Sequence, residues 1–211
     1  MTRTRHSFTL IEMLAVIAII GILAGLILPM VGRSREKARE TQAAAGANSI
    51  AMALRNFKMS YQQFPKVTID YDSTNDIYTP VGGGGKDDSS SGTNPNYDKI
   101  IFALSGTLPG GGKNDSELVT LRNKKKTSFI ELPAEYLKDN NAFFANPWGR
   151  RYYIVYAKPG KSILKFNSPK SSVELKVGSD VAVFSEVNPN TREFKDGSKL
   201  ATSWGGIINV K

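Results

Sequence analysis

An apolar stretch near the start of the chain, preceded by one carboxylate, constrains the fold more than any other feature. Residues 13–31 form a run of 19 without a charged side chain, and Glu12 lies directly before them. As a helix, this run would span roughly 28 Å, close to a bilayer hydrocarbon core of about 30 Å. An ionisable group in a membrane helix is costly, so it usually has a partner and a function. The sequence therefore predicts a membrane helix in which Glu12 has a specific role.

A removable secretory signal is the main alternative for this stretch. Such a signal has a basic start, here Arg3 and Arg5, then an apolar region of about 7–15 residues that ends at small residues. The apolar run here is longer, and residues 29–33 read PMVGR, which is not a cleavage site of that type. The helix is therefore expected to remain in the mature protein.

Residues 7–29, SFTLIEMLAVIAIIGILAGLILP, resemble the N-terminal signature of type IV pilins and type II secretion pseudopilins. In this family a basic leader is cut before the Phe of an F-T-L-I-E sequence, and the new N-terminus is methylated. The resemblance implies cleavage between Ser7 and Phe8 and methylation of Phe8. Counted from Phe8, Glu12 is fifth and Pro29 is twenty-second, as in the family pattern. Ser7 replaces the usual Gly, so slower processing is expected.

Cleavage before Phe8 would create a charge that can pair with Glu12. A free α-amine has a reference pKa of about 7.7–8.0 and is largely cationic at neutral pH. In a bundle of such helices, the Glu12 carboxylate can pair with the amine of a neighbouring subunit, which satisfies both charges and favours one axial stagger. We interpret Glu12 as the residue that sets this register; a Glu that snorkels to the interface is the alternative.

Three further residues of the stretch are candidates for filament assembly. Gly21 and Gly25 form a G-x-x-x-G face that allows close approach of helices in lipid. Pro29 removes the helical hydrogen bond to the carbonyl of Gly25 and predicts a hinge or melting point. Four basic residues between positions 33 and 39 would favour a cytoplasmic location for that flank. The more specific leader motif favours the opposite orientation, with the leader inside.

Beyond the apolar stretch, the pattern first predicts more helix and then strands. One stripe recurs at steps of three and four and should pack against a sheet: Ala47, Ile50, Leu54, Phe57 and Tyr61. The sequence before Pro65 should end the helix. Residues 66–98 are expected to be loop-like and residues 97–106 a short helix. From residue 129 onward, short runs rich in Val, Ile, Tyr and Phe predict a meander of antiparallel strands.

The predicted fold class is α+β, with a long N-terminal helix, half membrane-spanning and half amphipathic, packed on a small antiparallel sheet. Four segments are expected. A cleaved leader occupies residues 1–7, and a transmembrane and filament-core helix occupies residues 8–31. Its amphipathic continuation covers residues 32–63. A globular pilin-like head with Gly-rich loops, including an insert at 82–92 whose role the sequence leaves open, covers residues 64–211.

Two later segments resemble the major pseudopilin of type II secretion. The segment NPWGRRYYIVY at 146–156 is similar to the family's D-P-W-G-x-P-Y sequence, with Asn146 for Asp and Arg151 for Pro. The segment at 179–190, followed by Ser203 and Trp204, resembles the family's final strand and loop. The resemblance implies a structural subunit closest to the major pseudopilin.

Major pseudopilins place acidic calcium ligands before the final Ser-Trp pair. In this chain the weak candidates are Glu186, Asn188 and Asp196, but Lys199 lies where an acidic residue would be needed, and an ammonium repels a cation. We therefore expect no cofactor, with Lys199 or a hydrogen-bonded turn bracing the loop. A shallow calcium site around Glu186 and Asp196 is the alternative.

Composition argues against most enzymatic chemistry. The chain has no cysteine, and its single histidine, His6, lies in the expected leader. Cleavage would therefore leave no imidazole or thiol for a catalytic triad or a zinc site. The net charge of +9 would support only weak, nonspecific, salt-sensitive binding of DNA. The prediction is a protein that is not an enzyme.

The function predicted from these features is that of a structural subunit of a type II secretion pseudopilus or type IV pilus-like filament. It would be stored in the bacterial inner membrane as a single-pass protein with a periplasmic head and assembled after leader cleavage. Expected partners are copies of itself, other pseudopilins, the prepilin peptidase and methylase, and the inner-membrane assembly platform. The alternatives are a minor type IV pilin whose basic head binds DNA or surfaces for uptake, adhesion or motility, and a single-pass periplasmic enzyme.

Overall fold

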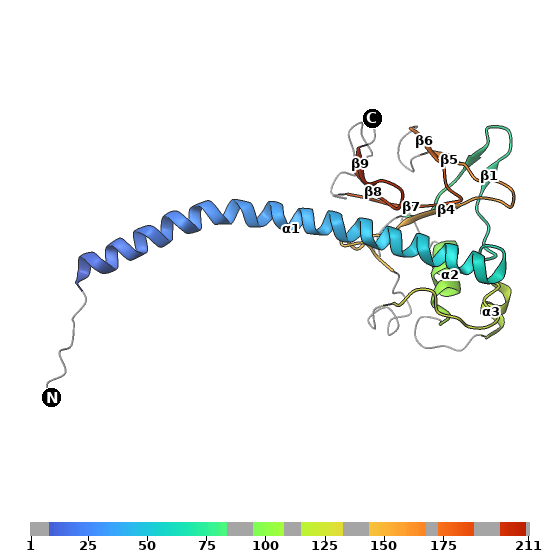
Figure 1. Cartoon of the computed structure of the whole chain (residues 1–211), viewed down its shortest axis with the longest axis horizontal. Coiled ribbons are helices and arrows are strands. Elements are labelled where there is room, and N and C mark those ends of the chain that lie inside the picture. Colours follow the sequence, from blue (N-terminus) through green and yellow to red (C-terminus); the bar gives the residue numbers. More distant parts are fainter. Residues whose placement is uncertain are drawn as a thin grey trace. The chain divides into compact units, whose positions relative to one another are not determined.

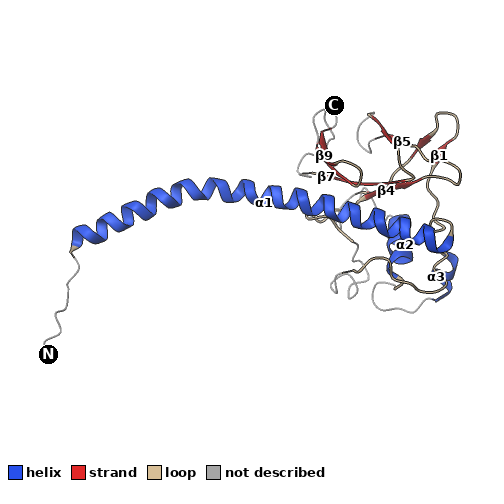
Figure 2. Cartoon of the chain, in the orientation of Figure 1, coloured by secondary structure: helices blue, strands red, loops and turns tan. Residues whose placement is uncertain are grey.

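The computed structural model describes residues 9–83, 95–107, 115–132, 144–167, 173–187 and 199–209 (Figure 1). The chain divides into two units, residues 1–39 and residues 40–211, and the second is called the head unit below. One helix, α1 (Leu10–Tyr61), contributes to both units. The head unit also contains two short helices, α2 (Pro95–Ser105) and α3 (Asp115–Thr120). Together with the strands described below, they confirm the predicted α+β class (Figure 2).

The C-terminal part of α1 is held in the head unit by the predicted stripe. Ala47, Ile50, Leu54 and Phe57 are fully buried, and Tyr61 is partly buried. Helix α1 ends at Tyr61, because Gln62 adopts a left-handed conformation with φ of 59°. The helix thus stops a turn before Pro65, at a residue whose backbone cannot continue it.

Two contacts fix the position of this part of α1 on the sheet. A Cβ on Gly46 would collide with the hydroxyl of Tyr152, so glycine at this position lets the helix approach the sheet closely. Asp180, in the turn between two strands, pairs with Lys58 at 2.7 Å and with Arg55 at 4.0 Å. The two cations are one helical turn apart, so the contact sets the rotation of α1 about its axis.

The strands form two sheets. A five-stranded antiparallel sheet has the order β3-β4-β7-β8-β9. Its strands are β3 (Val81–Gly82), β4 (Tyr153–Tyr156), β7 (Val181–Glu186), β8 (Lys199–Thr202) and β9 (Gly206–Asn209). A four-stranded sheet has the order β1-β2-β5-β6. Its strands are β1 (Tyr71–Asp72), β2 (Ile77–Tyr78), β5 (Leu164–Asn167) and β6 (Glu174–Val177).

The head unit is layered, with the five-stranded sheet in the middle (Figure 1). Ile154 and Val183 face the core shared with α1 and α2, whereas Val155 and Phe184 face a second core shared with the four-stranded sheet. Strands β4 and β7 are consequently buried at every position. Their sequences are continuous apolar runs because both of their faces are covered.

The expected simple meander is therefore wrong in its pairing. Strand β4 pairs with β7, in the register Ile154↔Val183, while β5 and β6 between them in sequence join the other sheet. One contact in that sheet is parallel, Tyr78↔Phe166. The region 66–98, expected to be loop, also contributes three two-residue strands, β1 to β3. Each of these strands is too short to show a period in sequence.

Candidate functional site

The N-terminus of α1 is closed by two residues of the F-T-L-I-E sequence. One carboxylate oxygen of Glu12, Oε2, accepts hydrogen bonds from the Thr9 backbone N–H and the Thr9 hydroxyl, both at 2.8 Å. In return, the Glu12 backbone N–H donates to Thr9 Oγ1 at 3.3 Å. This reciprocal arrangement is a capping box, which satisfies backbone donors that a helix start leaves unpaired.

Thr9 is the residue of this site that the sequence analysis missed. The signal was present, since Thr followed three residues later by Glu before an apolar run is the sequence signature of a capping box. Glu12 was assigned a partner only on another subunit, whereas its own chain already supplies two hydrogen bonds. Ser7 and Phe8, the expected cleavage and methylation positions, lie outside the described residues.

The Glu12 carboxylate retains capacity for another partner. No described residue donates to its second oxygen, Oε1, and the residue is exposed. An ionised carboxylate has about four acceptor positions, of which Thr9 occupies two. The site can therefore keep its helix cap and still accept a cation from outside the chain.

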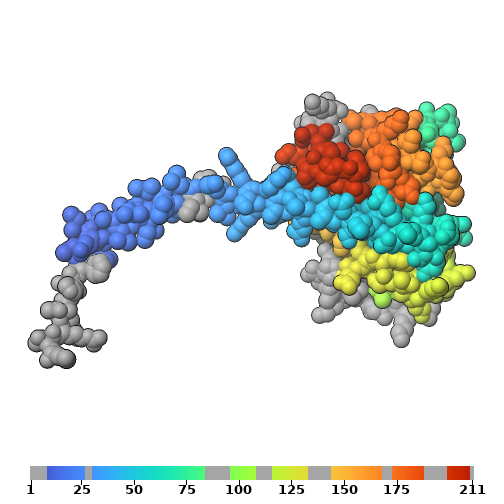
Figure 3. Space-filling model, viewed as in Figure 1, coloured from blue at the N-terminus to red at the C-terminus, as the bar shows by residue number. Residues whose placement is uncertain are grey.

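The helix that follows Glu12 is apolar on all sides. Between positions 10 and 31, thirteen large apolar side chains are 40% to 81% exposed. They are Leu10, Ile11, Met13, Leu14, Val16, Ile17, Ile19, Ile20, Ile22, Leu23, Leu26, Met30 and Val31. Figure 3 draws this stretch of α1 in blue. Helix α1 is long and apolar enough there to cross a membrane. A helix that is apolar all round requires an apolar surrounding, such as lipid or other helices.

The remaining assembly candidates lie along this part of α1. A Cβ on either Gly21 or Gly25 would meet nothing within 4 Å, so the glycine face is open. Helix α1 is assigned through position 29, although Pro29 cannot donate its backbone hydrogen bond. Nothing in the described residues shows which helix, if any, packs on the two glycines.

The expected calcium loop offers little to a cation in its described part. The carboxylate of Glu186 accepts a hydrogen bond from the Tyr153 hydroxyl at 3.1 Å and pairs with Arg150 at 3.4 Å. An arginine beside Glu186 competes with any metal ion for it. Asn188 and Asp196 lie outside the described residues, within which no group of three potential metal ligands is found.

Lys199 takes a different role from the one expected. Its Nζ lies 3.4 Å from Oε1 of Glu40, a buried carboxylate of α1. The lysine therefore ties β8 to α1 within the head unit, where it was expected to brace its own loop.

The NPWG segment is a turn closed by the side chain of its first residue. The Asn146 oxygen accepts the backbone N–H groups of Trp148 and Arg150, each at 3.0 Å. The Asn146 amide donates to Ser185 Oγ, and Gly149 adopts a φ of 74° that favours glycine. Asn thus does more than the family's Asp could, because an ionised carboxylate cannot donate to Ser185.

Arg151, which replaces Pro in that segment, pairs with a carboxylate inside the head unit. Its Nε lies 3.7 Å from an oxygen of Asp98 on α2, and both side chains are at least partly buried. Burial raises the pKa of Asp98, and the Arg151 guanidinium opposes this shift. The pair joins α2 to the strand region and offers no open site.

The densest basic cluster is carried by a turn. Lys124, Lys125 and Lys126 are exposed, and Asn123 beside them is fully buried. The Asn123 amide donates to the carbonyls of Ala103 and Thr127, both at 2.8 Å. These lysines are therefore exposed side chains on a turn that the buried Asn123 holds by hydrogen bonds.

Comparisons with known proteins add an independent finding. The family model described as the prokaryotic N-terminal methylation motif matches residues 2–28. The type II secretion system core protein G of Pseudomonas aeruginosa is 38% identical over 63 residues, and the proteins of that name from Aeromonas hydrophila and Escherichia coli are 35% and 34% identical over 63 and 64 residues. Each match covers 30% of this chain and 44% of the relative.

The chain thus spans less than half the length of the curated relatives it matches. No solved structure matches it significantly. The N-terminal methylation motif and the N-terminal match to these relatives show that the first part of the chain is similar to type II secretion pseudopilins, and the long helix followed by mainly antiparallel sheets is consistent with a pilin-like fold.

Proposed function

We propose that this protein is the structural subunit of a type II secretion pseudopilus or a closely related type IV pilus-like filament. The observation that carries the proposal is the first half of α1, whose apolar side chains are exposed on all sides behind a single carboxylate. Such a surface is stable only in lipid or among similar helices. The subunit would be stored in the inner membrane with its head in the periplasm and would join the filament after cleavage.

The proposed organisation follows from this role. Residues 1–7 are the leader and residues 8–31 form the membrane and filament-core helix. The segment 32–63 continues that helix as far as Tyr61, and residues 64–211 form the rest of the head. The prepilin peptidase, the inner-membrane assembly platform and other pseudopilins are the proposed partners, and copies of the chain itself form the bulk of the filament.

Glu12 is proposed to select the axial position of a neighbouring subunit. Cleavage between Ser7 and Phe8 exposes an α-amine, and Glu12 Oε1 has room to accept it while Oε2 stays bonded to Thr9. A charge pair in an apolar bundle is stable only when both partners are present and well placed. Gly21 and Gly25 would permit close helix contact, and Pro29 would allow the helix to adjust as it leaves the membrane.

Mass spectrometry of the mature N-terminus tests this assignment. A product that begins at methylated Phe8 is expected after expression with a prepilin peptidase, and an intact Met1 or a cut near Gly32 would refute it. Ser7→Gly should speed the cleavage and Ser7→Leu should block it. Equal rates across that series would remove Ser7 from the peptidase site.

A minor type IV pilin that binds DNA is the second candidate, favoured by the net charge of +9 and the exposed lysines at 124–126. Binding should then be weak and should fall steeply as salt rises. Tight, sequence-selective binding of duplex DNA by the full chain would promote this candidate over the filament subunit of a secretion system.

A further inference from the structure

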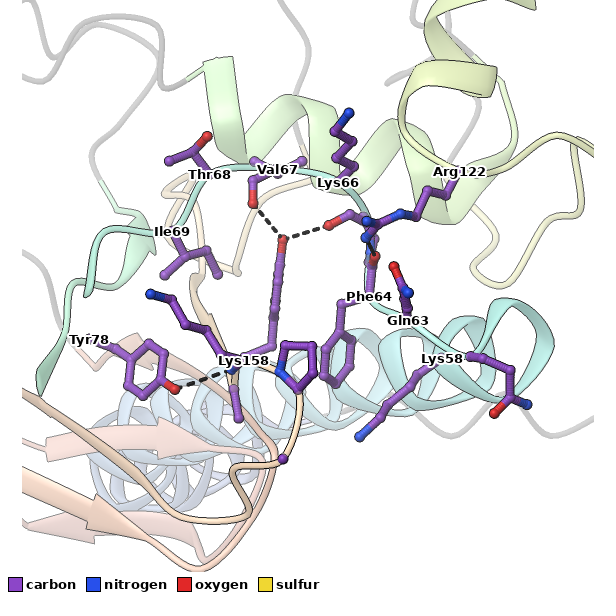
Figure 4. A pocket seen from close by; sticks show the side chains of 16 residues that line it. Lys58, Gln63, Phe64, Lys66, Val67, Thr68, Ile69, Tyr78, Arg122 and Lys158 are labelled. Atoms are coloured by element: carbon purple, nitrogen blue, oxygen red, sulfur yellow. Dashed lines mark hydrogen bonds between the residues drawn. The ribbon is translucent and has the colours of Figure 1, made fainter. Parts of the chain in front are cut away.

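A pocket of about 610 Å³ lies in the head unit at the point where α1 ends (Figure 4). Its walls come from the last turn of α1, from residues 62–69, and from residues 156–160 at the end of β4 and just beyond it, with Tyr78 and Arg122. This volume is within the range of about 300–1,000 Å³ that is typical of ligand sites. Filament formation, as proposed above, makes no use of it.

The pocket is lined by cations and by no carboxylate. In Figure 4, Lys66 and Arg122 lie next to each other along the upper wall, with the Lys66 side chain pointing outward, and Lys58 and Lys158 lie below them. Lys58 is compensated by Asp180 at 2.7 Å. Among the described residues, no carboxylate forms an ion pair with any of the other three cations. Lys158 Nζ lies over the Tyr71 ring at 4.1 Å from its centroid, and Arg122 donates to a backbone carbonyl, so the partners shown for these two cations are neutral. Positive charges without an anionic partner in a concave site favour an anionic occupant.

The pocket also has an apolar wall that is already in place. The rings of Phe64 and Tyr156 lie 4.8 Å apart. The Tyr156 hydroxyl donates to the carbonyls of Pro65 and Val67 at 3.0 and 3.3 Å, and burial raises its pKa, so it remains a donor. Arg122 donates to the Phe64 carbonyl at 2.9 Å. The wall is thus held by hydrogen bonds without any ligand.

The polar groups at the rim suit a polypeptide better than a small anion. Gln62, Gln63 and Thr68 are exposed there, and their side chains can both donate to and accept from a peptide backbone. Residues 66–69 belong to no strand of either sheet, although the carbonyls of Val67 and Thr68 accept hydrogen bonds from Tyr156 and Asn96.

We propose that this pocket binds a short acidic peptide segment of another protein. Its carboxylates meet Lys66, Arg122 and Lys158, and an adjacent apolar side chain packs on Phe64 and Tyr156. A nucleic-acid strand is the less suitable occupant, because the exposed lysines at 124–126 do not line the pocket. The inference goes beyond the proposed filament role, since it assigns a recognition site to the head unit.

Peptide binding to the full chain in neutral detergent micelles tests the proposal. The probe is acetyl-ELDFE-amide with an uncharged fluorophore, followed by fluorescence anisotropy. Two control peptides separate the contributions, acetyl-QLNFQ-amide without charge and acetyl-EGDGE-amide without apolar side chains. Each is expected to bind at least about tenfold more weakly than the probe. Equal binding of all three peptides, or none by the probe, would overturn the proposal.

Matched variants locate the site. Lys66→Gln combined with Lys158→Gln should weaken probe binding by at least about tenfold, whereas Lys124→Gln combined with Lys125→Gln removes the same charge outside the pocket and should change it less than about twofold. Equal losses in the two double variants, or competition by a short oligo-dT with equal strength in both, would overturn the pocket assignment. Filament formation by the first double variant should be normal, so the pocket and the filament role can fail separately.

Discussion

The two halves of α1 obey the same helical geometry but differ in what covers them. Leu14 and Leu23 of the first half are 56% and 53% exposed, whereas Leu54 of the second half is fully buried. The second half satisfies its apolar stripe within its own chain, against β4, β7 and α2. The first half leaves its apolar surface to lipid or to other subunits. Stability should therefore depend on the second half and assembly on the first.

Among these variants, Glu12→Gln should have the largest effect on assembly through the first half of α1. A Gln can still cap the helix from this position, but the charge is lost, so an α-amine in the filament core has no counter-ion. Because breaking a buried ion pair costs about 3–5 kcal/mol, filament yield should fall below roughly a tenth of the wild-type value. Electron microscopy of sheared fibres, with immunoblots of membrane and fibre fractions, measures it.

Thr9→Val is the matched control for that variant, since it keeps the carboxylate and removes the hydroxyl that caps the helix. Loss of a cap costs about 0.5–2 kcal/mol at a helix end, so reduced but clear fibre formation is expected. If Thr9→Val stops assembly as completely as Glu12→Gln does, the glutamate acts mainly as a cap and the register role is refuted.

The same substitution in each half of α1 distinguishes their contributions to the stability of the head unit. Leu54→Ala should lower the free energy of unfolding of the head unit by about 2–5 kcal/mol, because it leaves a cavity in a closed core. Leu23→Ala should leave that quantity within about 0.5 kcal/mol. Urea unfolding in detergent, followed by the fluorescence of Trp204, which packs against Phe166 and Phe184, reports on the head unit. Equal losses would mean that the first half also stabilises the head.

Removal of residues 1–32 tests more directly whether the head unit is stable without the first half of α1. The first buried apolar residue of α1 is Ala43, so the fragment should be soluble and monomeric, with its urea midpoint close to that of the full chain. Gel filtration and urea unfolding check both properties. An insoluble or unfolded fragment would show that the head unit depends on the filament or the membrane for its fold.

Calcium is expected to have the smallest effect. Since Arg150 and Tyr153 already occupy Glu186, the thermal midpoint of the head should change by less than about 1 °C between millimolar calcium and a chelator. Differential scanning calorimetry measures it. A rise of several degrees that is lost on Asp196→Ala would show that the loop binds calcium through other ligands.

The sequence predicted the long helix and its buried stripe because both depend on local periodicity. It did not reveal the second sheet, although the runs YIVY and VAVF contain a hint. In an antiparallel strand with one solvent-exposed face, apolar and polar residues alternate. These runs do not alternate, so both faces of each strand must pack against other elements. Which segment provides that cover is a matter of long-range pairing, such as Tyr78 with Phe166, and no local pattern encodes it.

The candidate sites also differ in whether a local sequence pattern reveals them. Glu12 was identified from spacing alone, and Thr9 could have been, because the capping signature is local. The pocket at the end of α1 could not, because Lys66, Arg122 and Lys158 are far apart in sequence and meet only through the fold. The part of the expected calcium loop that is described shows that Glu186 has a partner, Arg150, that the sequence analysis did not consider.

The Thr9 cap has a consequence for the reversibility of the proposed filament. Because Thr9 already bonds one oxygen of Glu12, the carboxylate of a stored subunit is partly compensated before any neighbour arrives. A neighbour's α-amine would bind at Oε1 without displacing Thr9 from Oε2. A subunit would accordingly enter or leave the filament without unwinding the start of its helix, so one cap serves both the stored and the assembled molecule.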